Sequence, residues 1–122
     1  MLRDVSVIFG IIFLAAGILG FIPTCSPNQM LLGIFPVNAF HSFIHLVLGG
    51  FAVGFAFAHK HHTKRFLEVL GILLVFWGIG GLFYGENHIF GLITNNMADT
   101  ILHLIAGVIA LLFGFASKAR RV

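Results

Sequence analysis

The stretch GIFPVNAFHSFIHL, residues 33–46, has a second copy in GLITNNMADTILHL, residues 91–104, at a constant offset of 58 residues without a gap. The two copies share the pattern G-x-x-x-x-N-x-x-[HD]-x-x-x-H-L, and each leads into a strongly apolar segment. A repeat of this period indicates that one structural unit occurs twice. It also places ionisable side chains inside apolar segments, where such groups are candidates for function.

The composition predicts a membrane protein. Of the 122 residues, 59% are hydrophobic and 9% are charged, and the mean hydropathy is +1.06. A soluble domain of this size exposes too much surface to hide so many apolar side chains. A membrane-spanning helix needs about 20 apolar residues to cross roughly 30 Å of hydrocarbon. Four segments have this length, approximately Val5–Ile22, Ala39–Ala58, Phe66–Tyr84 and Met97–Ala116.

All seven Lys and Arg residues fall on one side of this four-span arrangement. They are Arg3 before the first span, Lys60, Lys64 and Arg65 in the middle loop, and Lys118, Arg120 and Arg121 after the last span. The positive-inside rule therefore predicts a multi-pass membrane protein with both termini and the middle loop in the cytoplasm. The basic residues are too few and too scattered to predict nucleic-acid binding, and anionic lipid head groups account for their charge.

The first span resembles a signal peptide, but its glycines argue that it is retained. At an offset of 61 residues, Gly10, Gly17 and Gly20 correspond to Gly71, Gly78 and Gly81 of the third span. The chain then consists of two tandem helical hairpins, about 1–58 and 66–116, related by a pseudo-two-fold axis along the membrane normal. We predict an all-α fold, a bundle of four transmembrane helices in two hairpins of parallel topology, forming a single domain over residues 1–122.

Glycine spacing predicts where helices pack. Glycines seven residues apart lie nearly on one helical face and let two backbones approach closely. Three such pairs are present, Gly10 with Gly17, Gly71 with Gly78, and Gly107 with Gly114. We assign these glycines to helix packing. Trp77 lies in the middle of the third span, where we expect a packing role rather than cofactor stacking.

A stripe of small and polar residues runs along the second span and another along the fourth. At 100° per residue, each stripe occupies one helical face. Phe and Ile side chains suited to lipid occupy the opposite faces, so the stripes are predicted to face the bundle interior. The stripes are Asn38, His41, His45, Gly49, Ala52 and Ala56 in the second span, and Asn96, Asp99, His103, Gly107, Ala110 and Gly114 in the fourth.

One hypothesis for the polar ends of these stripes is structural. Asn38 and Asn96 are good N-cap residues, and Pro36 favours a break before the second span. Asp99 then occupies the third helical position, where a carboxylate benefits from the helix dipole. Under this hypothesis His45 and His103 are buried neutral imidazoles that hydrogen-bond across the bundle.

A second hypothesis treats the same side chains as ligands. The residues His41, His45, Asp99 and His103 supply three imidazoles and a carboxylate, a set suited to zinc, iron or copper. Alternatively, His45 and His103 on facing spans are axial ligands for haem or another tetrapyrrole. A proton relay along His and Asp is a further alternative. The absence of any bound cofactor is the default expectation, and the residues leave these alternatives open.

Other polar residues are weaker candidates. His59, His61 and His62 form a cluster in the middle loop, where we expect a solvated segment. Glu86 and His88 lie in the loop between the third and fourth spans, and polar loop residues need no special role. Cys25 is the only cysteine, so no internal disulfide forms. No phosphate-binding loop, dinucleotide fingerprint or Ser-His-Asp set is present, which gives no support to an enzymatic role.

Taken together, the Gly-rich first span and the two N-x-x-[HD]-x-x-x-H elements resemble the bacterial four-helix membrane family catalogued as domain of unknown function 4383. The resemblance covers nearly the whole chain, and it implies a small bacterial inner-membrane protein without a defined reaction. It carries over Asn38, His41, His45, Asn96, Asp99 and His103 as signature positions.

The function predicted from the sequence is that of an accessory or scaffold subunit of a membrane protein complex. Little mass lies outside the spans, and the Gly-rich and Phe-rich faces suit contact with other membrane subunits or with a second copy of the chain. The alternative is a metal- or tetrapyrrole-binding redox or transport protein that uses the inward His and Asp residues.

Overall fold

The computed structural model of the protein describes residues 2–22, 24, 30–31, 33, 35–36, 38–84 and 96–117. Four long helices dominate these residues. Two strands of two residues each pair in antiparallel fashion before the second helix, with Leu31 opposite Phe35. The elements are α1 (Leu2–Gly20), β1 (Met30–Leu31), β2 (Phe35–Pro36), α2 (Ala39–Ala56), α3 (Lys60–Tyr84) and α4 (Met97–Ala116).

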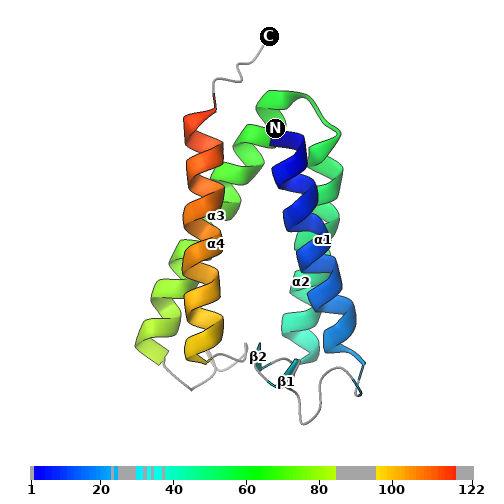
Figure 1. Ribbon diagram of the computed structural model, residues 1–122, viewed down its shortest axis with the longest axis vertical. Coiled ribbons are helices and arrows are strands. Elements are labelled where there is room, and N and C mark those ends of the chain that lie inside the picture. Colours follow the sequence, from blue (N-terminus) through cyan, green and yellow to red (C-terminus); the bar gives the residue numbers. More distant parts are fainter. Residues whose placement is uncertain are drawn as a thin grey trace.

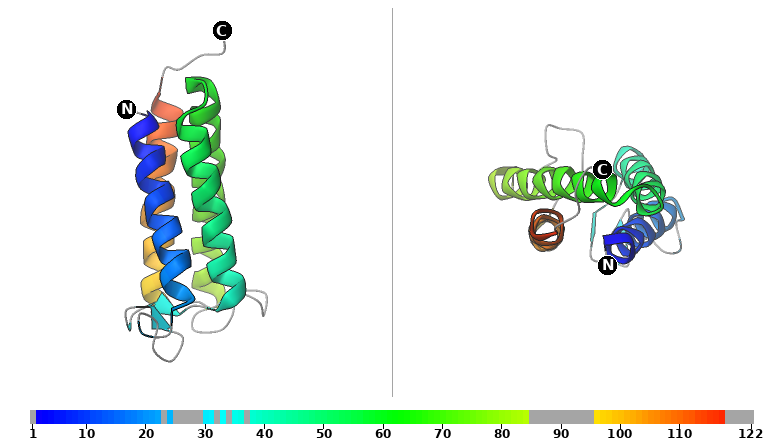
Figure 2. Two further views of the ribbon diagram at one scale, coloured as in Figure 1. Left: turned by 90° about the vertical axis from the view of Figure 1, so that its right-hand side faces the viewer. Right: turned by 90° about the horizontal axis from the view of Figure 1, so that it is seen from above.

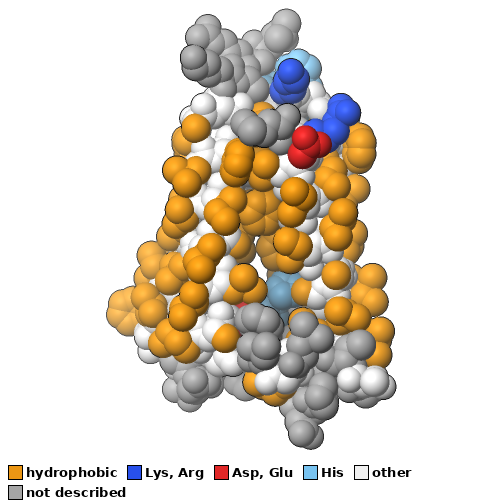
Figure 3. Space-filling model, in the orientation of Figure 1, with side chains coloured by type: hydrophobic (Ala, Val, Ile, Leu, Met, Phe, Trp, Pro, Cys, Tyr) orange, Lys and Arg blue, Asp and Glu red, His pale blue; other side chains and the backbone are white. Residues whose placement is uncertain are grey.

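All four helices are long and apolar enough to cross a membrane. Their outward faces carry large hydrophobic side chains, including Phe43, Phe51, Ile72 and Ile105, each about half exposed. Such faces are stable against lipid and would be costly in water. Figure 3 shows hydrophobic side chains over the whole height of the visible face, whereas described Lys and Arg side chains gather near one end. The protein is therefore a small multi-pass membrane protein.

The helices are arranged as two antiparallel hairpins. Helix α1 packs along α2, and α3 packs along α4, while contacts between the two pairs are much sparser. Figures 1 and 2 show both chain ends at one end of the bundle, and β1 and β2 at the other. Below, the first is the termini end and the second, where α2 and α4 begin, is the cap end. The predicted all-α bundle of two tandem hairpins is confirmed.

Each hairpin is held together by the same glycine contact. A Cβ atom added to Gly49 on α2 would lie 3.0 Å from the carbonyl oxygen of Gly10 on α1. In the second hairpin a Cβ atom on Gly107 would lie 3.1 Å from the carbonyl oxygen of Gly71. These separations leave no room for a side chain, so the backbones touch directly.

The repeat extends to the neighbours of these glycines. Gly17 packs against Leu46 and Gly78 packs against Leu104, and both leucines belong to the duplicated stretches. Gly114 packs against Glu68, whose carboxylate lies 2.9 Å from the Lys64 ammonium group. All six glycines predicted to pack therefore lie at interfaces inside the hairpins.

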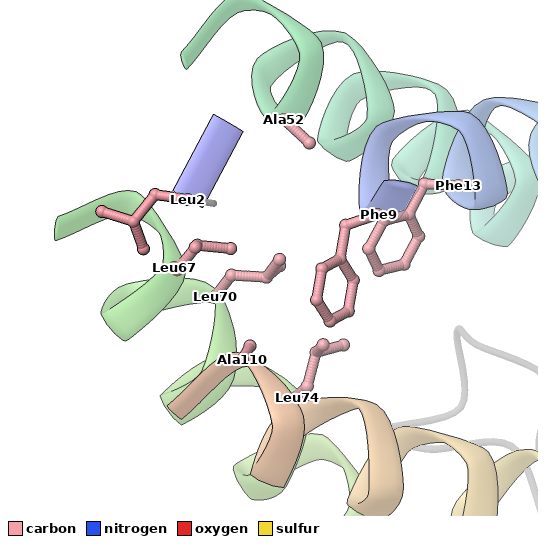
Figure 4. Close-up of a cluster of buried hydrophobic side chains, with 8 residues drawn as sticks. All are labelled: Leu2, Phe9, Phe13, Ala52, Leu67, Leu70, Leu74 and Ala110. Carbon is pink, nitrogen blue, oxygen red and sulfur yellow. The ribbon is translucent and has the colours of Figure 1, made fainter. Parts of the chain in front are cut away.

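The two hairpins meet through a cluster of buried apolar side chains. Figure 4 shows aromatic rings of α1 and leucines of α3 pointing toward one another, with small residues of α2 and α4 beside them. Because α2 and α4 contribute only alanines, the larger side chains of α1 and α3 fill the space. The cluster consists of Leu2, Phe9, Phe13, Ala52, Leu67, Leu70, Leu74 and Ala110.

The structure corrects the predicted boundary of the third span. Helix α3 begins at Lys60 rather than near Phe66, so Lys60, Lys64 and Arg65 are helical. The expected loop fails to form because local hydrogen bonds start the helix early. The His59 carbonyl accepts from the N–H groups of His62 and Thr63. The Thr63 hydroxyl donates to the carbonyl of Phe55 at 2.6 Å, which fixes the turn between α2 and α3.

Candidate metal centre

Two asparagines set the start of the helices that carry the candidate site. Asn38 caps α2, and its side-chain oxygen accepts from the N–H of His41 at 2.7 Å. Asn96 caps α4 in the same way, accepting from the N–H of Asp99 at 2.8 Å. Both have extended backbones, as N-cap residues do. Because the caps occupy equivalent places in the repeat, His45 and His103 each lie seven residues beyond a cap.

The polar residues of both helices lie inside the bundle. His41 and Asp99 are each 3% exposed and His103 is 7% exposed, while His45 is partly buried. Further along the same stripes, Gly49, Ala52, Ala56, Gly107, Ala110 and Gly114 are all buried. The opposite face of each helix is exposed. These faces carry Phe40, Phe43, Val47 and Phe51 on α2, and Ile101, Ile105 and Ile109 on α4.

Three histidines converge from the two hairpins. His41 and His45 of α2 and His103 of α4 each place a ring nitrogen so that the three atoms lie within 4.8 Å of one another. The ring centroids of His41 and His45 are 4.3 Å apart, and those of His41 and His103 are 6.3 Å apart. The imidazoles of α2 and α4 therefore approach each other in the space between the two hairpins.

Asp99 lies beside this group rather than in it. Its Oδ1 is 3.7 Å from Nδ1 of His103, one helical turn away. The predicted set of four ligands is therefore replaced by three imidazoles with a carboxylate next to one of them. Asp99 and His103 are four residues apart on α4, a spacing at which two side chains are neighbours on one helical face.

Several polar atoms of the site are buried without a hydrogen-bond partner among the described residues. They are Nδ1 of His45, Nδ1 of His103 and Oδ2 of Asp99. An unsatisfied buried polar atom costs about 1–3 kcal/mol. Two imidazoles of the cluster and the neighbouring carboxylate therefore hold polar atoms that a purely structural hydrogen-bond network would satisfy. A bound cation is one way to relieve this cost.

The imidazoles form the polar part of a cavity of about 290 Å³. Its other walls are apolar and come mainly from α2 and α3, with one phenyl ring from α1. Figure 3 shows a hollow between the hairpins with histidine surface inside it, toward the cap end. The cavity is lined by Phe13, His41, Ile44, His45, Leu48, Leu70, Leu73, Leu74, Phe76, Trp77 and His103.

The apolar lining is the part of the site that the sequence did not predict. Leu70, Leu74 and Trp77 lie three or four residues apart on α3, which is the spacing of one helical face. That signal is present in the sequence, but the same spacing serves ordinary packing. Trp77 was expected to pack, and it lies at the wall of the cavity.

His59, His61 and His62 form no comparable group, and His61 and His62 lie in the first turn of α3 rather than in the predicted loop. Nδ1 of His59 and Nδ1 of His61 are 2.8 Å apart, but His59 and His62 are exposed, and the part of the chain that is described has no three-ligand group there. The Nδ1 of His59 also accepts from the N–H of His61, as a cap of α3 does. Cys25, Glu86 and His88 lie outside the described residues.

The fold and the site together define a small polytopic membrane protein, a four-helix bundle with a histidine cluster between two hairpins. Residues 3–116 match the family described as Domain of unknown function (DUF4383). The chain belongs to this family, as the resemblance of its paired motifs implied. No curated protein and no solved structure matches the chain.

Proposed function

We propose that this protein binds a transition-metal ion between its hairpins, through His41, His45 and His103. The observation that carries the proposal is the convergence of three ring nitrogens within 4.8 Å from helices of both repeats. Zn–N bonds of about 2.0–2.1 Å in tetrahedral geometry would bring such nitrogens to about 3.3 Å from one another. Small rotations of imidazole rings at the wall of a cavity are enough to close that difference.

The chemistry of the donors favours zinc or copper. Imidazole is a good ligand for both metals, and three protein ligands with a fourth position open are typical of catalytic zinc sites. If Nε2 of His103 binds the ion, Nδ1 of the same ring lies 3.7 Å from Oδ1 of Asp99, and a carboxylate in that place orients a ligating imidazole. When it is ionised beside a bound cation, Asp99 also supplies a negative charge, which lowers the cost of that cation among apolar side chains.

The alternative ligand predicted from the sequence was a tetrapyrrole held by His45 and His103. A volume of about 290 Å³ is at the lower end of pockets for drug-sized molecules, about 300–1,000 Å³. The third imidazole, His41, also stands in the cluster where a macrocycle would need space. A single ion suits these dimensions better.

The predicted role as an accessory subunit has weaker support. That prediction drew on glycine-rich helix faces, and Gly10, Gly49, Gly71 and Gly107 are occupied by contacts within the chain. A metal site, by contrast, is supported by an arrangement that only the folded chain produces. We therefore base the functional proposal on the histidines.

The test is metal content in protein purified from membranes with an affinity tag that contains no histidine. The starting variant replaces His59, His61 and His62 by Gln, which removes adventitious binding at the exposed cluster. We expect about one zinc or copper ion per chain by elemental analysis. His45→Gln and His103→Gln should each lose it while the helical circular dichroism is unchanged. The proposal would be falsified by a starting variant that contains no metal after incubation with Zn²⁺ or Cu²⁺. An equal metal content in the starting variant and in both His→Gln variants would also rule it out.

A further inference from the structure

We infer that the cavity beside the histidines takes a lipid-soluble organic molecule whose single polar group is the fourth ligand of the metal ion. This inference rests on the proposed metal site and names the class of molecule that the site would meet. The evidence lies in the walls of the cavity, in the place where it opens and in the position of its polar atoms.

The walls divide into one polar part and one apolar part. The three imidazoles are the polar side chains of the lining, and Leu48, Leu70, Leu74 and Trp77 are among the apolar ones. A molecule that matches this pattern has one donor atom and an otherwise hydrocarbon body. A volume of about 290 Å³ is close to the lower limit of about 300 Å³ for pockets that hold drug-sized molecules, so it suits a small organic molecule. A medium-length alkyl alcohol is of this size and chemistry.

The cavity reaches the lipid-facing surface. Leu73 and Phe76 of α3 line it, and yet they are 53% and 62% exposed. Both lie in the apolar central part of a candidate membrane span. A molecule dissolved in the bilayer can therefore enter sideways between the helices, without crossing water. Sites between the helices of a bundle are common places for small ligands.

The buried ring nitrogens argue against a plain acyl chain as the occupant. His103 is 7% exposed, and its Nδ1 and that of His45 have no hydrogen-bond partner among the described residues. Once these imidazoles hold a metal ion, a hydrocarbon chain alone would leave the fourth coordination position of that ion without a donor atom. A molecule with a polar head next to a metal ion would satisfy the cluster and also fill the apolar part.

The protein carries its own reporter for this binding. Trp77 is the only tryptophan and lines the cavity. The experiment titrates the zinc-loaded protein in nanodiscs with 10-bromodecan-1-ol and, separately, with 1-bromodecane, and follows quenching of Trp77 fluorescence. The two probes have the same chain and bromine, and only the first has a polar head. We expect saturable quenching by the alcohol, with an apparent affinity about tenfold or more above that of bromodecane.

A pair of variants tests whether the cavity is the place of binding. Leu48→Phe adds volume inside the cavity, and Leu112→Phe makes the same change on an exposed face of α4. We expect the first to abolish saturable quenching and the second to leave it unchanged, with the zinc content equal in both.

The outcomes separate this inference from the proposed function, because zinc is measured in the same samples. If zinc is bound and the two probes quench Trp77 equally, whether saturably or not, the inference is overturned and the metal site stands. Zinc present with alcohol-selective quenching that survives Leu48→Phe also overturns it. Absence of bound zinc overturns the metal site and this inference together.

Discussion

Asp99 and His103 are one helical turn apart, and their side chains lie 3.7 Å from each other in a buried position. We expect Asp99→Asn to weaken zinc binding about 10–100-fold, because the amide keeps the size but loses the charge that supports His103. Isothermal titration with a competing chelator measures the affinity. The matched control is Asp4→Asn on the exposed first turn of α1, which should bind zinc as the parent does. Equal affinities in both variants would remove Asp99 from the site.

The side chain of Asn96 contributes to stability through the hydrogen bond that it accepts from the N–H of Asp99. Asn96→Ala should lower the free energy of unfolding by about 1 kcal/mol, since an alanine cannot accept from the N–H of Asp99. Asn96→Asp should retain most of the stability because its carboxylate can accept the same bond. Unfolding in mixed micelles, followed by circular dichroism, gives both values. If Asn96→Asp lowers the stability while Asn96→Ala leaves it unchanged, the capping role of Asn96 is contradicted.

Between the helices, the glycine contacts predict which glycines can be replaced by alanine without loss of stability. A Cβ on Gly107 would lie 2.8 Å from the backbone nitrogen of Val75, whereas a Cβ on Gly50 meets nothing within 4 Å. Gly107→Ala should therefore destabilise the protein by about 1–3 kcal/mol through overpacking. Gly50→Ala should be neutral or stabilising by up to about 1 kcal/mol, because alanine favours the helix. The two variants make the same chemical change, so unfolding measurements on them isolate the effect of the interface.

The helices also show what a sequence can predict. Span lengths, the capping role of Asn38 and Asn96, and the inward faces of α2 and α4 depend on local chemistry and on the helical period, and both are visible in the chain. The predicted start of α3 was wrong because Lys60, Lys64 and Arg65 lie in a polar beginning of the helix, which hydropathy assigns to a loop. Hydropathy detects the apolar part of a helix and misses a polar extension beyond the membrane.

The candidate site can be predicted only when the arrangement of the whole molecule is known. Whether His41, His45 and His103 meet depends on how the hairpins are placed against each other, and that placement follows from the bulk of side chains such as Phe9, Phe13 and Leu70. The sequence predicted four ligands because Asp99 shares a stripe with His103. Only the three-dimensional arrangement shows that three imidazoles converge while the carboxylate stands beside them, and that a cavity adjoins them.

The orientation of the bundle in the membrane remains a prediction from its charges, and the chain contains a means to test it. Cys25 is the only cysteine of the chain, and in the sequence it falls between Gly20, where α1 ends, and Ala39, where α2 begins. The described Lys and Arg side chains gather near the termini end, away from these two helix ends. A membrane-impermeant maleimide should label Cys25 in intact cells. In a Cys25→Ser background, His62→Cys at the termini end should be labelled only after the membrane is permeabilised. The reverse pattern would place the termini outside.

The sparse contact between hairpins leads to a prediction for the complete protein. Each hairpin has its own glycine interface, and the two hairpins share a cluster of buried apolar side chains. Two chains covering residues 1–58 and 59–122 should therefore insert separately and associate in the bilayer, as stable helix pairs do. Because His41 and His45 belong to one half and His103 to the other, the zinc site forms only on association.

Co-purification of the halves, with one zinc ion per pair and none on either half alone, is the expected result. His103→Gln in the second half should abolish zinc binding but leave the association intact, since the apolar cluster does not include that residue. Replacing Leu70 by Ala in the same half should weaken the association itself, because it removes a fully buried side chain from the hairpin interface. Zinc bound by a single half, or halves that associate only through His103, would show that the hairpins are not the units from which this site is built.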